Sequence, residues 1–134
     1  MYQSTVTIYC KRGEGYLPRA LSGVEIQIGT AAIAKAFGVE ANNNGVLLIP
    51  LELKDGELCT REDGLKCMRP KQWENTEDVS GAVYFGANEC FVVRGNVSEP
   101  ASFEQIKSAH DDVYLIASAT FYEGVLPHLE VILK

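Results

Sequence analysis

The sequence predicts an all-β fold, a mainly antiparallel small barrel or sandwich with one or two short helices and one long loop. Three observations lead to this prediction. Short runs that alternate apolar and polar residues recur about every ten residues, as in all-β domains. Gly, Asn, Asp or Pro closes each run. By its length of 134 residues the chain forms a single domain, residues 1–134, large enough for a hydrophobic core.

The clearest predicted strand covers residues 22–28. In it Val24, Ile26 and Ile28 alternate with polar residues, which is the pattern of a half-buried strand with its apolar side chains facing inward. Other runs of this kind predict strands at residues 4–10, 46–53, 82–85, 90–94, 113–122 and 129–133.

Turn signals separate these strands. Residues 11–18 contain two glycines and are expected to form a turn, and Asp55-Gly56 is typical of a hairpin. Pro50 has no backbone donor for a ladder, so the strand at 46–53 is expected to lie at a sheet edge or to carry a bulge.

Two segments have helical patterns. Residues 30–37 are rich in alanine and end before Gly38, a residue that commonly stops helices. Residues 102–109 begin with Ser102, which is suited to cap a helix. Both segments are short, so each is expected to pack on the sheet for stability.

Charge and hydropathy exclude some classes of function. The net charge of −6 argues against a duplex-DNA binder, which would need clustered Lys and Arg, but it is compatible with DNA passing nearby. No run of about 18 apolar residues predicts a membrane span. The first residues, MYQSTVTIYC, lack the pattern of a signal peptide, so synthesis in the cytoplasm is expected.

The four cysteines form no CxxC pair and are expected to be free thiols. A three-residue loop at 62–64 would place Cys59 opposite Cys67, which would allow a cross-strand bridge or half of a metal site. Zinc would need two more ligands, so no metal is expected. The remaining candidates are all distant in sequence: Cys10, Cys90, His110 and His128.

No catalytic residue and no cofactor are predicted. His110 lies beside Asp111 and Asp112, which could orient it, but no Ser or Cys stands in a nucleophile motif. A small β-barrel enzyme using His110 is therefore kept only as an alternative. His128 follows Pro127 at a strand start, where a structural hydrogen bond is the simpler interpretation.

A long irregular loop is predicted at about 58–81, and it contains the only tryptophan of the chain. Such loops in small domains are usually functional or disordered. Trp and Arg are common anchors of protein interfaces, so an interface loop is predicted. Its residues are Arg69, Pro70, Lys71, Gln72 and Trp73. The alternative is that Trp73 fills the protein's own core.

Five pieces of the chain, in this order, resemble a family of small structural proteins encoded in the head-to-tail gene module of long-tailed phages. The pieces are TVTIY (5–9), PKQW (70–73), GANECFVVRG (86–95), DDVYLIAS (111–118) and LPHLEVIL (126–133). The pair Cys59 and Cys67 departs from that pattern. Among such proteins a head-closure, or stopper, subunit is most similar to a small β-barrel with one long loop.

The resemblance implies a virion protein at the head–tail junction, made in the host cytoplasm, without catalysis or cofactor. Its expected partners are further copies of itself, six in a ring, and the neighbouring portal or adaptor and tail-terminator or tail-tube proteins. DNA would pass through the ring without specific binding, and Trp73 would be buried against another subunit. Two alternatives stay open, a tail-terminator subunit and a small acidic binding or inhibitor module that is a stable monomer.

Overall fold

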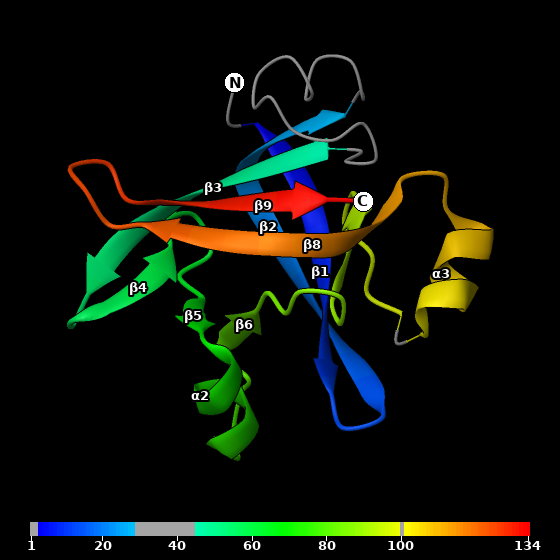
Figure 1. Ribbon diagram of the computed structural model, residues 1–134, viewed down its shortest axis with the longest axis horizontal. Coiled ribbons are helices and arrows are strands. Elements are labelled where there is room, and N and C mark those ends of the chain that lie inside the picture. Colours follow the sequence, from blue (N-terminus) through cyan, green and yellow to red (C-terminus); the bar gives the residue numbers. More distant parts are fainter. Residues whose placement is uncertain (1–2, 29–44, 100) are drawn as a thin grey trace.

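The computed structural model describes residues 3–28, 45–99 and 101–134, and it confirms the predicted all-β class (Figure 1). Six strands form a closed antiparallel barrel in the order β2-β1-β7-β8-β9-β3, with β3 pairing back to β2. These strands are β1 (Ser4–Arg12), β2 (Gly15–Ile28), β3 (Gly45–Lys54), β7 (Phe91–Arg94), β8 (Val113–Tyr122) and β9 (His128–Leu133).

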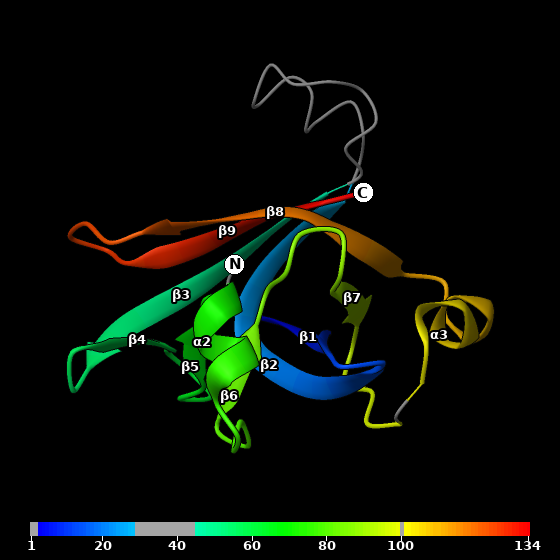
Figure 2. The same ribbon diagram turned by 60° about the horizontal axis from the view of Figure 1, so that its bottom comes forward.

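Three short strands extend the sheet from the far end of β3, as Figure 2 shows at the lower left. They are β4 (Glu57–Thr60), β5 (Lys66–Met68) and β6 (Ala82–Tyr84), and the helix α2 (Pro70–Asn75) connects β5 to β6. The connecting helix makes the β5–β6 pair parallel. Half of the segment expected as an irregular loop at about 58–81 is therefore regular structure, namely the end of β4, all of β5 and α2, so the prediction of one long irregular loop is wrong.

β2 closes the barrel because it pairs first with β1 and then with β3. Gly23 lies at the register shift within the β1–β2 ladder, between the pairs formed by Leu21 and Val24, and it has a φ of +65°, a conformation that favours glycine at a bulge. The turn expected at 11–18 is shorter than predicted, since β2 already begins at Gly15. Val24 is fully buried and Ile26 partly, but Ile28 at the strand end is 39% exposed and does not face inward as expected.

β3 is not an edge strand, although Pro50 led to that expectation. β3 pairs with β9 along one side and with β2 and then β4 along the other. Pro50 lies between the last pair with β2, at Leu48, and the first pair with β4, at Leu51. A missing backbone donor is tolerated at this position because no ladder partner needs it there.

The core fills the barrel, and a second apolar cluster lies under the helix α3 (Phe103–Ala109). Ile106 of α3 packs there with Tyr9 and Phe91, whose rings stack with centroids 4.7 Å apart. Ser102 caps α3 through a capping box with Gln105, which confirms the predicted helix start. The helix expected at 30–37 lies outside the described residues. No helix in the described part of the chain is both long and apolar enough to cross a membrane.

Candidate protein interface

Trp73 lies in the protein's own core, with a side chain only 3% exposed. Pro70 occupies the start of α2, a position suited to proline, and the helix turns Trp73 toward the barrel. The indole stacks on Tyr84 with ring centroids 5.5 Å apart. The expectation that Trp73 is buried against another subunit is wrong, because α2 lays it against β6 and the β1–β2 hairpin instead.

Arg12 fixes α2 to the barrel. Its guanidinium donates to the carbonyl oxygen of Trp73 at 2.6 Å and to that of Thr76, at the end of the helix. It also lies 5.3 Å from the indole ring, within cation–π range. The carbonyl groups at the end of a helix lack intrahelical partners, so a cation there stabilises the helix.

The other residues of the predicted interface loop are Arg69, Pro70, Lys71 and Gln72, and all four are exposed on or beside α2. Their side chains do not contribute to the barrel core, so their role in an interface stays a prediction. The guanidinium of Arg69 lies 5.0 Å from the ring of Phe121 on β8. Arg69 therefore faces the β8–β9 hairpin.

Two hairpins, β3–β4 and β8–β9, project from the same end of the barrel (Figures 1 and 2), and each carries exposed apolar side chains. We call these side chains together the hairpin-tip patch. Val125 is 97% exposed, Leu126 76% and Leu53 67%. Tyr122 also belongs to it. Exposed apolar groups gathered in one region commonly mark a site of protein contact. Sequence reasoning missed this patch, although two apolar residues inside the β8–β9 turn were a usable signal.

A groove runs from this patch to α2, and we call it the hairpin groove. Its volume is about 450 Å³. One wall is the β8–β9 hairpin, with Phe121 and Glu123, and the other is formed by β4, β5 and the start of α2. The residues that line the second wall include Leu58, Lys66, Cys67, Arg69 and Gln72. The groove thus joins part of the predicted interface loop to the hairpin-tip patch.

A second groove, of about 590 Å³, lies on the other side of α2, between the helix and the β1–β2 hairpin. Trp73 and Tyr84 line it together with charged residues of both signs, Lys11, Arg12, Glu74 and Glu89. The Tyr84 hydroxyl donates to Glu89 at 2.7 Å, and burial together with this carboxylate raises the pKa of Tyr84. The Tyr84 hydroxyl is therefore already engaged within the chain, which fits a structural role for this residue.

All four cysteines are free thiols. Cys59 pairs with Lys66 rather than with Cys67, because the turn at 61–64 is one residue longer than expected, so the predicted opposition of Cys59 and Cys67 is wrong. Burial raises the pKa of the Cys10 and Cys67 thiols to about 12. Such thiols are poor nucleophiles and poor metal ligands. No group of three or more potential metal ligands occurs within residues 3–28, 45–99 and 101–134.

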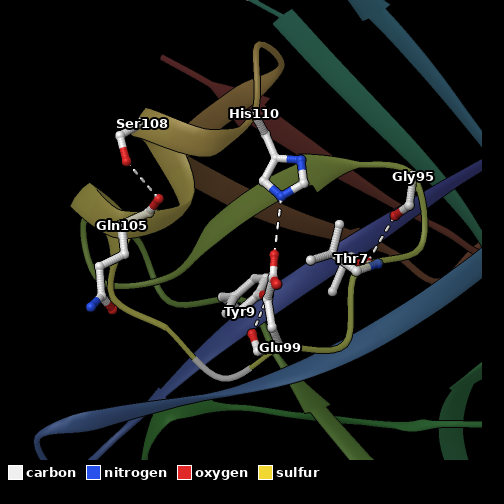
Figure 3. Close-up of polar contacts among 8 residues, drawn as sticks. Thr7, Tyr9, Gly95, Glu99, Gln105, Ser108 and His110 are labelled. Carbon is white, nitrogen blue, oxygen red and sulfur yellow. Dashed lines mark hydrogen bonds and ion pairs between the residues drawn. The ribbon is translucent and has the colours of Figure 1, made fainter.

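The histidines make structural contacts. The Nε2 of His110 lies 3.2 Å from a carboxylate oxygen of Glu99, and neither Asp111 nor Asp112 orients the ring (Figure 3). The hydroxyl of Tyr9 donates to the carbonyl oxygen of the same Glu99 at 2.6 Å. His128 contacts the carbonyl oxygen of Leu126 at 3.1 Å. In the described part of the chain no hydroxyl or thiol is hydrogen-bonded to either imidazole.

Comparisons with protein-family models, with curated proteins and with solved structures find no match.

Proposed function

We propose that this chain is a structural virion protein of the phage head–tail interface, a head-closure or connector subunit that forms a ring around the DNA channel. One observation supports it most, the hairpin-tip patch. Val125, Leu126 and Leu53 expose most of their apolar surface on hairpin tips, although other residues already fill the core of the barrel. Burying such side chains against another protein is favourable by about 25 cal/mol per Å² of apolar area.

The fold supports a ring for geometric reasons. A ring needs side contacts between two different surfaces of neighbouring subunits, and such heterologous contacts close when the rotation between subunits divides a full turn. The patch lies at one end of the barrel, and α3 lies at the other side (Figure 1). A net charge of −6 is suited to a channel wall that DNA passes without sticking.

The proposed partners are further copies of the chain, with six as the expected number, and the portal or adaptor and tail-terminator or tail-tube proteins on either side. A tail-terminator subunit of the same joint is the nearest alternative, because it needs the same ring geometry. An acidic inhibitor module is a third candidate. The apolar character of the patch favours the assembly roles, since an inhibitor acting by its charge would not need it.

The experiment is a nonsense mutation in the gene for this chain, in the phage that carries it. The proposal expects heads and complete tails that fail to join, seen by electron microscopy of the lysate. Heads that leak DNA identify the head-closure role, whereas closed heads with overlong tails identify the terminator. Normal, infectious particles would exclude both assembly roles.

A point variant tests the patch itself in the same phage. Leu126→Asp is expected to reduce the yield of joined particles while the protein stays folded. Ser98→Asp adds the same charge at an exposed position away from the patch, and it serves as the matched control. Equal particle yields from the two variants would contradict the proposed role of the patch.

A further inference from the structure

The hydrogen bonds of β9 show which backbone N–H and C=O groups of β8 are directed toward β9 and which are directed away from it. Leu51 of β3 donates to the carbonyl oxygen of Pro127 at 3.0 Å, and Lys134 and Leu115 exchange two bonds of 2.9 and 3.1 Å. In an antiparallel ladder, alternate residues bond to opposite neighbours. The odd-numbered residues of β9 therefore bond to β3, and its even-numbered residues bond to β8.

The same alternation identifies a free edge on β8. Its residues Ser118, Thr120 and Tyr122 lie opposite even-numbered residues of β9, so their backbone groups are used within the barrel. Ala119 and Phe121 then direct their N–H and C=O groups away from β9. Within the described residues, no backbone or side-chain group bonds to them from that side.

This edge lacks the usual protection against strand pairing. Residues 117–122, ASATFY, contain no charge and no proline. Natural edge strands commonly carry Lys, Pro or a covering segment, because unpaired backbone groups otherwise recruit another strand. The open side of β2 has such protection, since Pro18 lies in it and Arg19 reaches across to the carbonyl oxygens of Ala82 and Val79. Among the described residues, no such feature protects the free edge of β8 at Ala119 and Phe121.

The hairpin groove reaches this edge at Phe121, and its opposite wall carries a cation, Arg69, without an ion pair among the described residues. Lys66 is paired with Glu57 at 2.7 Å, but Arg69 forms no ion pair with any described residue. Its guanidinium is held near the Phe121 ring at 5.0 Å. An Arg that is fixed on an aromatic ring and lacks a carboxylate is well placed to bind one from a partner.

We infer that the hairpin groove binds an extended segment of another protein, which adds a strand to the free edge of β8 and places a carboxylate on Arg69. The unpaired backbone groups require a strand, and the cation selects an acidic residue within it. Alternate side chains of the added strand face Phe121 and Leu58, so apolar residues are expected there. The inference stands independently of the proposed virion role.

The first test needs only the protein itself. Amide hydrogen exchange followed by NMR at low protein concentration should be fast at Ala119 and Phe121 and slow at Thr120 and Tyr122. Slow exchange at Ala119 and Phe121 in the monomer would overturn the inference, because the edge would then be occupied already. Protection that grows with protein concentration would also overturn it, because the occupant would be a second copy.

The second test uses a defined peptide as the probe. It is an acetylated and amidated heptapeptide of alternating valine and threonine with one central aspartate. Binding should protect Ala119 and Phe121 from exchange. The same peptide with lysine at the centre should have a dissociation constant about two- to fivefold higher, the range expected for the loss of an exposed ion pair. Failure of the aspartate peptide to protect these two amides at millimolar concentration would refute the inference.

Two variants separate the edge from the cation. Ala119→Pro removes the outward N–H without touching the ladder to β9, and it should abolish binding, while Ala119→Ser keeps the N–H and should bind. Arg69→Glu should reverse the preference between the aspartate and lysine peptides. Lys71→Glu makes the same charge change on α2 outside the groove and should leave the preference unchanged. An equal effect of Arg69→Glu and Lys71→Glu would show that net charge, rather than the site, selects the peptide.

Discussion

The indole Nε1–H of Trp73 donates a hydrogen bond of 2.8 Å to the backbone carbonyl oxygen of Lys11, 62 residues earlier in the chain. The bond satisfies the one polar group of a side chain that is otherwise buried. It joins α2 to the end of β1, beside the hairpin that leads into β2. Trp73 therefore holds an accessory layer against the barrel and is expected to act on stability.

Replacing Trp73 by alanine should lower the free energy of unfolding by about 3–5 kcal/mol, the usual cost of a large aromatic side chain removed from a core. Trp73→Phe keeps most of the stacking on Tyr84 but leaves the Lys11 carbonyl without its donor, so it should cost about 1–3 kcal/mol. Urea melts of the purified protein measure both. Lys71→Ala, on the exposed side of α2, should change stability by less than about 0.5 kcal/mol. If the Trp73→Ala protein were as stable as the parent, Trp73 would not contribute to the core, and an interface role would be favoured instead.

Arg12→Ala should release α2 from the barrel, because the end of the helix loses the donor to Trp73 and Thr76. The expected loss of stability is about 2 kcal/mol, as for hydrogen bonds from a charged donor. Amide exchange at Trp73, whose N–H bonds to Arg69, should become faster. The control is Arg94→Ala, an exposed arginine at the end of β7. Unchanged exchange in the Arg12 variant would show that packing alone holds α2.

The hairpin-tip patch should be dispensable for folding. Val125→Ser combined with Leu126→Ser is expected to change the free energy of unfolding by less than about 0.5 kcal/mol, because both side chains are mostly in water. Self-association measured by sedimentation should weaken. The same change at Leu129, a fully buried neighbour on β9, should cost several kcal/mol. A strongly destabilised double variant would mean that the tips pack on the protein itself.

Stability should fall in alkaline solution. Burial raises the pKa of Cys10 from 9.0 to about 12, so this thiol ionises in the unfolded chain before it does so in the folded one. Its contribution is complete below pH 9 and is lost as the pH rises toward 12. At pH 10 the loss from Cys10 alone is on the order of 1 kcal/mol. Urea melts between pH 8 and pH 10 should therefore show a smaller decrease in Cys10→Ala than in the parent. Parallel curves for the two proteins would contradict this account.

Local sequence signals predicted the barrel strands and α3, but they missed β4, β5 and α2. Residues 113–122 were predicted as a strand and form β8 with the same bounds, and Ser102 caps α3 as its side chain favoured. Both signals depend on residues that are close in sequence. The first is the alternation of side chains along a strand, and the second is a hydroxyl beside the free N–H groups at the start of a helix. The all-β class follows from the sum of such signals.

The position of Trp73 could not be predicted in this way, because it depends on contacts that are distant in sequence. Arg12 and Lys11 from the first hairpin hold α2, and nothing near PKQW indicates them. Cys59 missed its expected partner by one residue, since a turn one residue longer shifts the whole register. The free edge of β8 could not be predicted either, because it depends on which strands pair with β8 in the sheet.

The place of β9 in the barrel has a consequence for biosynthesis. β9 is the last barrel strand along the chain, yet it lies between β8 and β3 and bonds to both. A nascent chain that ends before His128 leaves β3 and β8 without the strand between them, so the barrel cannot close on the ribosome until that strand emerges from the exit tunnel. Closure of pairings so far apart in sequence is slow. Until then the apolar faces of β3 and β8 stay exposed, which favours aggregation of the incomplete chain.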